Sequence, residues 1–305
     1  MVRRVRRHSI RVAPLPDWLD APRLLGPALA GEDDSRGWTF GAGAIAGTRL
    51  AEAELEAEPA ADLAARLRGL VLEGRAIECV IQPSLARTQV RAGRLVDARR
   101  RRNVSVGFSR RGAELDDEGR WSLTPEALAL ALGERAMSRA SRAGRVVIDA
   151  GCGVGGNAIG FARAGCEVVA IERSRERLAM AQHNAMLYGV ADRIRFILGD
   201  ALLLAEPFVV AGAIVFCDPP WGRDAAERAL HLDDMPLLAP LRALAERRGA
   251  ALWAKLPAAF PVAEIGGAAE AVFGVAEGDW RRIKFVLVRR DTLAADGEEG
   301  ERQEG

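Results

Sequence analysis

Two stretches of this sequence carry residues whose types and spacing could do chemistry, and the first is the segment Val146–Asn157. Three β-branched apolar residues run into Asp149, and four glycines follow between Gly151 and Gly156. This pattern is typical of a buried strand, a glycine turn and a helix N-terminus, where backbone N–H groups can approach a ligand closely. The glycines satisfy Gly-x-Gly-x-x-Gly, so both a dinucleotide and S-adenosylmethionine remain open as ligands.

The second stretch is Asp218–Trp221, an Asp-Pro-Pro-Trp loop that follows the apolar run 213–217. Pro219 and Pro220 make a rigid loop without N–H donors, so its carbonyls and the Asp218 carboxylate are free to accept hydrogen bonds. Trp221 offers a flat stacking surface. The four residues could therefore hold a planar ring and aim its exocyclic amine at an electrophilic methyl group, a catalytic role based on positioning and electrostatics. A hydride-transfer enzyme would have no evident use for such a loop.

Acidic residues stand at the ends of three predicted strands. Asp149 suits a cationic group, such as the methionyl ammonium, and would repel a pyrophosphate. Glu172, 23 residues later, is placed to accept hydrogen bonds from ribose hydroxyls in either cofactor class. Asp200, followed by Ala201, could hold an adenine amino group. The structural alternatives are a surface glutamate at 172, a turn aspartate at 200 and a proline pair that only ends a strand.

Alternating strand and helix patterns would position these residues. The pattern predicts strands at 145–150, 167–172, 193–198, 212–217 and 249–255, helices at 157–164, 174–188 and 235–247, and a short helix near 261–266. Such alternation indicates an α/β, Rossmann-like fold with a mainly parallel, doubly wound sheet that binds ligands at the carboxyl ends of its strands. Two last strands, 269–276 and 281–289, form an antiparallel C-terminal edge hairpin. Thr124 is the expected cap, and Pro125 the first residue, of a helix that ends near residue 138.

The chain divides into three predicted parts. Residues 1–105 form a small N-terminal accessory α/β domain, irregular up to about residue 35, with a helical face at 60–73 and a strand at 76–81. Residues 106–290 form the ligand-binding domain. Residues 291–305 are acidic and glycine-rich, which predicts disorder. The basic run Arg99–Arg102 is either a phosphate-binding patch or a solvated helix end.

Composition excludes several classes of function. With 305 residues, 49% apolar and 28% charged, the sequence can bury a full core, and its net charge of +1 gives no whole-chain attraction to nucleic acid or acidic membranes. The four cysteines form no Cys-x-x-Cys pair and the three histidines have no partners at ligand spacing, so we predict no metal site. No run reaches the roughly 20 apolar residues of a membrane span. A cytoplasmic enzyme is expected, and the oligomeric state stays open.

In combination, these residues resemble the trimethylguanosine synthase family of RNA cap guanine-N2 methyltransferases, as a divergent, bacterial-type member. The resemblance rests on the glycine turn, residues 187–194, Gly199-Asp200 and the Pro-Pro-Trp-Gly loop. The segments Leu115–Gly119 and Ser122–Glu126 also match that family's lead-in to its catalytic domain.

The resemblance implies a class I methyltransferase fold over residues 106–290, S-adenosylmethionine as the methyl donor, and the N2 amine of a guanine in RNA as the acceptor. By this carry-over Trp221 stacks on the guanine. The implied cofactor-binding residues are Thr124 and Pro125 near the methionyl end, Asp149, Gly151, Gly153 and Gly155 along it, Glu172 at the ribose, and Asp200 with Ala201 at the adenine.

Several positions depart from that family's pattern. Asp218 stands where the family usually has serine, Arg110-Arg111 replace an acidic pair, and Leu256–Ala259 lacks the arginine of a Leu-Pro-Arg-Asn phosphate contact. Phe108 or Trp121 could supply the second aromatic ring that encloses the base. Two other functions therefore stay open: an N-methyltransferase of a small aromatic or nucleoside-like amine, and a nucleic-acid-binding module with little or no turnover.

Overall fold

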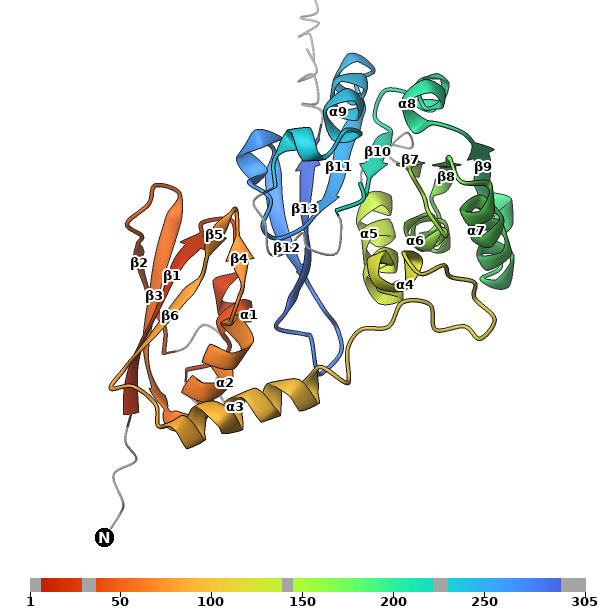
Figure 1. The fold of residues 1–305 in the computed structure, drawn as a ribbon. Helices are drawn as coiled ribbons and strands as arrows, with labels where there is room; N and C mark the ends of the chain where they lie inside the picture. The colour runs from red at the N-terminus through yellow and green to blue at the C-terminus, as the bar shows by residue number, and fades with distance from the viewer. Residues whose placement is uncertain (1–6, 29–36, 139–144, 222–229, 292–305) are drawn as a thin grey trace, which may run out of the picture.

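The large sheet of this protein has seven strands in the order β12-β13-β11-β10-β7-β8-β9 (Figure 1). The computed structural model describes residues 7–28, 37–138, 145–221 and 230–291, so the predicted disordered tail lies outside it except for residue 291. The strands are β7 (Val146–Ala150), β8 (Glu167–Glu172), β9 (Ile194–Leu198), β10 (Ile214–Cys217), β11 (Ala251–Leu256), β12 (Ala268–Phe273) and β13 (Ile283–Arg290).

Strands β7 to β11 are parallel, and β13 is antiparallel to both β11 and β12. The sheet is therefore mainly parallel with an antiparallel hairpin at its edge, which confirms the predicted α/β, Rossmann-like fold class. The order reverses between β7 and β10, and in open α/β sheets ligands bind beside the carboxyl ends of the strands at that point.

Alternate residues of the parallel strands face two separate cores, as the two-residue period of a strand requires. On one face Val147 and Phe216 pack with helices α5 (Glu126–Met137), α6 (Gly156–Ala164) and α7 (Arg175–Leu187). On the other face Ile148 and Val215 pack with α8 (Ala201–Leu204) and α9 (Leu238–Arg247). The sheet is thus covered by helices on both sides, which explains why its strands read as continuous apolar runs.

Helices α5 and α6 approach each other closely through two glycines. A Cβ on Gly160 would lie 2.4 Å from the carbonyl carbon of Ala129, and one on Gly133 would lie 2.6 Å from the Cβ of Ala164. The N-terminal end of α5 follows Thr124 and Pro125, and that of α6 follows the glycine turn. The glycine contact therefore sets the distance between two parts of the predicted site.

One local prediction at α5 is wrong. The N-cap residue is Pro125, and Thr124 makes no capping hydrogen bond. Thr124 is buried, and its hydroxyl has no hydrogen-bond partner in the part of the chain that the structure describes. The restricted φ of Pro125 begins the helix instead, which leaves the threonine hydroxyl unused by the helix.

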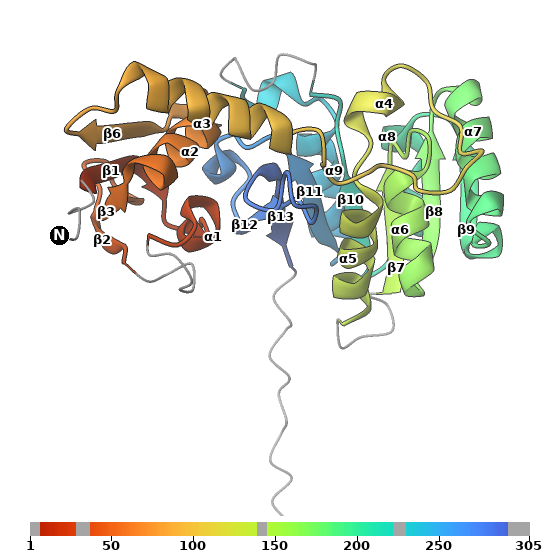
Figure 2. The same ribbon diagram turned by 90° about the horizontal axis from the view of Figure 1, so that it is seen from below.

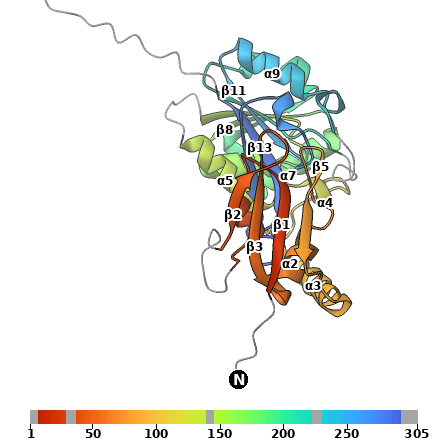
Figure 3. The same cartoon turned by 90° about the vertical axis from the view of Figure 1, so that its left-hand side faces the viewer.

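The N-terminal unit is built on a second, antiparallel sheet with the order β2-β3-β1-β6, beside the edge of the large one (Figures 1 and 3). Its strands are β1 (Arg7–Pro16), β2 (Thr39–Ala42), β3 (Thr48–Glu56) and β6 (Glu78–Gln82), with the short hairpin β4 (Val71–Leu72) and β5 (Arg75–Ala76). Its helices are α1 (Ala21–Leu25), α2 (Ala57–Leu67) and α3 (Arg87–Arg100).

The prediction that the first 35 residues are irregular is wrong for β1, which pairs with both β3 and β6 inside the sheet. Ile10, Val12 and Leu15 of β1 are fully buried. The strand alternates buried and exposed residues up to Val12, a pattern that its arginines and prolines obscure in the sequence. Residues 1–6 and 29–36 of that segment lie outside the described residues.

The N-terminal core continues onto the edge strand of the large sheet. Ala271 and Phe273 of β12 are buried together with Ile10, Leu24 and Leu63. Because the two units share this apolar contact, their cores are not separate, and the boundary that we placed after residue 105 stays a prediction.

We expect Gly160→Val to lower the free energy of unfolding by about 2 to 3 kcal/mol, since the added side chain must push α5 away from α6. Urea denaturation would measure this change. The matched control is Gly41→Val on the exposed edge strand β2, where an added Cβ meets no atom within 4 Å. Equal effects at the two positions would show that the α5–α6 contact is not tight.

Candidate active site

A cavity of about 1250 Å³ lies at the carboxyl ends of β7, β8 and β10. Ligand pockets for one small molecule are usually about 300 to 1000 Å³, so this one has room for a cofactor and part of an acceptor together. The predicted site residues that line it are Thr124, Pro125, Gly151, Gly153, Glu172, Asp200, Ala201, Asp218, Pro219, Pro220 and Trp221. Two predicted residues, Asp149 and Gly155, lie outside the lining.

The glycine turn presents open backbone to the cavity. Gly151 and Gly153 have φ values of +93° and +55°, which L side chains rarely adopt. A Cβ on Gly153 would meet no atom within 4 Å, and one on Gly151 would meet only Leu237 at 3.9 Å. Gly155, with φ +91°, instead faces α7, where a Cβ would lie 3.1 Å from that of Ala181. Gly151 and Gly153 thus leave an open stretch of backbone toward the cavity, which we call the glycine cradle. Gly155 allows α7 to pack closely behind it.

Glu172 holds the glycine turn in place. One carboxylate oxygen accepts a hydrogen bond from the Gly153 N–H and the other from the Ser174 N–H, each at 2.9 Å. The side chain is almost fully buried at the end of β8, yet it lines the cavity. Each oxygen keeps a further lone pair, so Glu172 can still accept hydrogen bonds from a pair of hydroxyl groups.

Asp200 has a structural role as well as a place in the cavity wall. Its carboxylate caps α8 by accepting a hydrogen bond of 2.8 Å from the Leu202 N–H. The turn role that we considered as an alternative is therefore present, and it leaves the second oxygen of the carboxylate available. The contact of Asp200 with an adenine stays a prediction.

Asp149 lies behind the lining, with none of its surface exposed. Burial raises its pKa to about 8, with further contributions from the charges of Asp218 and Glu172, while the Ala158 N–H and Lys255 oppose the shift. Neither oxygen makes a hydrogen bond of normal geometry within the described residues. A neutral carboxyl here is the expected form until a cation approaches, because an isolated buried charge is costly. Its contact with a methionyl ammonium stays a prediction.

The Asp218–Trp221 loop is fixed by a residue that the sequence did not lead us to include. The Nζ atom of Lys255, at the carboxyl end of β11, lies 2.7 Å from an Asp218 carboxylate oxygen and 4.9 Å from the centre of the Trp221 ring. Asn157, on α6, donates a second hydrogen bond of 3.0 Å to the same oxygen. Lys255 is only 4% exposed, so this ion pair is weakly screened by solvent. Asp218 and Trp221 are thereby held by one ammonium group.

One sequence signal could have found Lys255. Lys255 and Lys284 are the only lysines of the chain, whose other basic residues are arginines. Lys255 also ends a predicted strand that neighbours the Asp218 strand in a doubly wound sheet. Asn157 follows the last glycine of the turn and was noted only as part of that motif.

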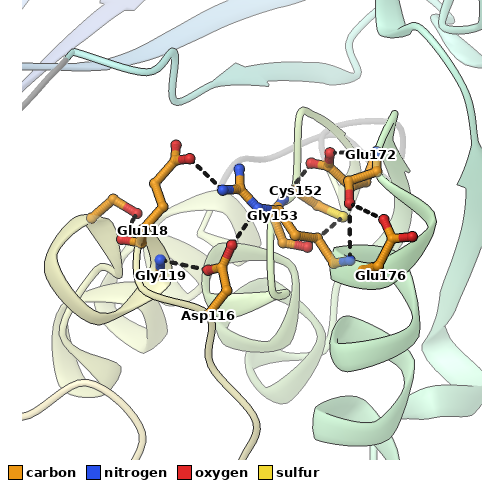
Figure 4. A network of polar contacts seen from close by, with 10 residues as sticks. Asp116, Glu118, Gly119, Cys152, Gly153, Glu172 and Glu176 are labelled. Carbon is orange, nitrogen blue, oxygen red and sulfur yellow. Dashed lines mark hydrogen bonds and ion pairs between the residues drawn. The ribbon is translucent and has the colours of Figure 1, made fainter.

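Asp116 and Glu118, which line the cavity, belong to a network of polar contacts that Figure 4 shows. Asp116 accepts a 2.7 Å hydrogen bond from Nε of Arg177 on α7, and Glu118 pairs with the same guanidinium. Burial raises the pKa of Asp116, but the Gly119 N–H and Arg177 outweigh it, so the pKa lies below its ordinary value. This anchor holds the short helix α4 (Gly119–Ser122) and its residue Trp121 at the rim.

Both candidates for a second aromatic ring line the cavity. Phe108 packs on Tyr188 with 5.5 Å between ring centroids, and Trp121 is 42% exposed. Residues 69–71 of the N-terminal unit also line the cavity, a contribution that we did not predict from the sequence. Among the described residues there is no metal-binding cluster and no helix long and apolar enough to cross a membrane.

Comparison with known proteins places the similarity in the central part of the chain. A family model described as RNA cap guanine-N2 methyltransferase matches residues 144–233. The matched segment holds the glycine turn and the Asp218–Trp221 loop, two of the motifs on which the resemblance to that family rests.

Two relatives in the family are trimethylguanosine synthases. The one from Schizosaccharomyces pombe is 38% identical over 121 residues, which cover 38% of this chain and 49% of the relative. The one from Saccharomyces cerevisiae is 31% identical over 137 residues, covering 42% and 43%. The chain thus spans about half the length of these relatives.

A solved structure, an RNA methyltransferase from Salinibacter ruber in complex with S-adenosyl-L-homocysteine, is 20% identical, with a TM-score of 0.38. The similarity covers 58% of this chain and 97% of that one.

The N-terminal unit and Lys255 lie outside the segment matched by the family model.

We expect the free energy of unfolding of Asp149→Asn to increase, relative to that of wild type, as the pH rises from 5 to 8. The folded-state pKa of about 8 lies above the ordinary aspartate pKa of 3.8, so unfolding releases the proton and wild-type stability falls over this range. The variant has no titrating carboxyl at this position and so shows no such loss. The difference in unfolding free energy between variant and wild type should therefore grow by at least about 1 kcal/mol between pH 5 and 8. Urea denaturation at several pH values measures it, with Asp117→Asn, an exposed aspartate, as control. A difference that does not change with pH would contradict the buried, protonated state.

Proposed function

We propose that this protein is an S-adenosylmethionine-dependent N-methyltransferase that acts on the exocyclic N2 amine of a guanine in RNA. The observation that carries the proposal is the placement of the Asp218–Trp221 loop, fixed by Lys255, on the same cavity as the glycine turn. The match of residues 144–233 to a family model described as RNA cap guanine-N2 methyltransferase supports it. The cytoplasmic location expected from the sequence is part of the same proposal.

The cavity residues fit the cofactor. Gly151 and Gly153 offer open backbone, Glu172 can accept hydrogen bonds from two ribose hydroxyls, and the unpartnered Thr124 hydroxyl lines the same cavity. The buried Asp149 would balance a cationic amino group through its own ionisation. When bound, S-adenosylmethionine supplies an electrophilic methyl group on a sulfonium. A pyrophosphate would bring negative charge to a region that already holds Asp149, Glu172 and Asp218, which disfavours a dinucleotide.

The loop can orient an aromatic amine. The Asp218 carboxylate and the Pro219 carbonyl accept hydrogen bonds from the two amine hydrogens, and the ring stacks on Trp221. Accepting both hydrogens draws the nitrogen lone pair out of conjugation with the ring, which makes the nitrogen a better nucleophile. Held in this way, the amine nitrogen would be placed to accept the methyl group that the bound cofactor supplies, and it would then release one proton to water.

Lys255 has two effects on this chemistry. Its ammonium pairs with the Asp218 carboxylate and fixes the position of that side chain, and its contact with the Trp221 ring restricts the orientation of the stacking surface. Because Lys255 and Asn157 bond to the same Asp218 oxygen, the other oxygen remains available for the substrate.

We expect mass spectrometry of nucleosides from RNA treated with enzyme and S-adenosylmethionine to show N2-methylguanosine. Asp218→Ala and Trp221→Ala should each reduce this product by a factor of about 100 or more, because each removes a positioning contact. Cofactor affinity, measured by calorimetry, should change little, since neither side chain belongs to the glycine cradle.

Three results would change the assignment. Methylation of free aromatic amines but not RNA would favour the small-molecule enzyme, and cofactor binding without any transfer would favour a nucleic-acid-binding module. Loss of cofactor affinity in both variants would mean that the loop contacts the cofactor and not the acceptor.

We expect Lys255→Met to reduce the methylation rate by a factor of about 10 or more, because the Asp218 carboxylate and the Trp221 ring both lose the ammonium that contacts them. Lys255→Arg should restore part of the rate because it restores the charge beside Asp218. The rate of N2-methylguanosine formation measures the effect. A rate in Lys255→Met equal to that of wild type would show that the ion pair does not position the loop.

A further inference from the structure

Helix α3 and the two residues after it carry a concentrated positive charge. Between Arg87 and Arg102 the sequence has seven arginines and one acidic residue, Asp97, although the whole chain has a net charge of only +1. The basic run Arg99–Arg102 is the C-terminal end of this segment, so the predicted helix end is confirmed. The charge needs an explanation that the methyl-transfer site does not supply.

One side of α3 is used for packing. A Cβ on Gly93 would lie 2.5 Å from the Ala61 carbonyl oxygen of α2, so this glycine faces the protein. Arg100 pairs with Asp62 of α2 at 2.5 Å. The buried Asp97 is paired with Arg101 and Arg282. These charges are already neutralised by the fold.

The opposite side of the segment is a row of unpaired cations, which we call the arginine face. In the described part of the chain, its members are exposed and have no acidic partner. The members are Arg87, Arg91, Arg94, Arg99 and Arg102. The first three follow one another at intervals of four and three residues, so they lie on one stripe with about 5 Å between successive turns. A row of this kind matches a line of regularly spaced anions better than a single anion.

The arginine face leads toward the cavity. Figure 2 shows α3 running from the N-terminal sheet toward the side of the molecule that holds α4. The chain continues from Arg102 directly into Ser105, Gly107 and Phe108, which line the cavity. Buried Asp279 holds this exit in place by accepting hydrogen bonds from the Ser105 N–H and hydroxyl, both at 2.8 Å.

We propose that the arginine face binds the phosphate backbone of the RNA whose guanine enters the cavity, and this proposal rests on the proposed function. Charge complementarity and continuity with the cavity favour an RNA strand. An acidic membrane is a poorer match, because a helix that binds one inserts an apolar face, whereas Leu95 is the only large apolar side chain exposed on α3. Phosphate contacts set affinity and register, while the cavity selects the base.

The test is the triple variant Arg87→Gln, Arg91→Gln, Arg94→Gln, with a fluorescein-labelled single-stranded RNA of mixed sequence as the probe. Fluorescence anisotropy between 50 and 200 mM salt should show affinity at least about 10-fold weaker at the middle of this range. The slope of log affinity against log salt should become less steep by about 2, since each lost phosphate contact on a single strand contributes about 0.7.

The matched control removes the same charge elsewhere: Arg193→Gln, Arg195→Gln, Arg247→Gln, three exposed arginines beside β9 and on α9. It should bind the RNA within about twofold of wild type. Arg91→Glu alone provides an independent variant, and urea denaturation checks that each variant is folded. If the triple variant binds the RNA with the same affinity and the same salt slope as wild type, the proposal is overturned.

Methylation separates this proposal from the proposed function. With RNA as substrate the triple variant should have a raised KM, and with a free guanosine nucleotide its kcat/KM should equal that of wild type. If no RNA is methylated, the anisotropy assay still decides the arginine face, because it needs no turnover. Binding to phosphatidylserine vesicles that is lost in the triple variant, with RNA binding unchanged, would assign the face to membranes and refute the proposal.

Discussion

The ion pair between Asp218 and the buried Lys255 is the interaction on which the geometry of the candidate site depends. The carboxyl ends of three neighbouring parallel strands bring Asp149, Glu172 and Asp218 into one region, with a single buried ammonium among them. Like charges at such separations cannot all be ionised at low cost. The fold meets this constraint in three ways: Asp149 has a raised pKa, Glu172 accepts two backbone hydrogen bonds, and Asp218 is paired with Lys255.

The ion pair follows directly from the register of the sheet. Cys217 of β10 is the partner of Ala254 of β11, so the next residues along these parallel strands, Asp218 and Lys255, become neighbours. One residue of slip between the two strands would place the two side chains on opposite faces of the sheet. The Asp218–Trp221 loop is therefore positioned by the pairing of two fully buried strands, and the helices on each face of the sheet keep that pairing fixed.

Most of the large sheet could be predicted from the sequence because its signals are local. Apolar runs such as 213–217 and the glycine turn identify strands and the cofactor side of the cavity without knowledge of distant residues. The family resemblance was confirmed for the same reason, since its motifs are short and continuous. The pairing of Lys255 with Asp218 was beyond such signals, because it needs the register of two strands that are 37 residues apart.

Other features were missed or misread for related reasons. In β1, the arginines and prolines led us to predict irregular structure, although Ile10 and Val12 alternate with polar residues as in a strand. Pairing with β3 and β6 on both sides makes this segment a strand. The place of Asp149 behind the glycine turn and the contribution of residues 69–71 to the cavity wall arise from tertiary packing alone. The acceptor side of the site is thus built largely from long-range contacts, whereas the cofactor side is built from local ones.

The shared core at β12 has a consequence for how this protein folds and fails. Because Ala271 and Phe273 are buried among residues of the N-terminal sheet, the two units lose apolar contacts together and should melt in one cooperative transition. A chain cut between the units would expose that apolar strand at the edge of the large sheet, where unpaired edges promote self-association. The N-terminal unit therefore covers apolar side chains of an edge strand that would otherwise be exposed.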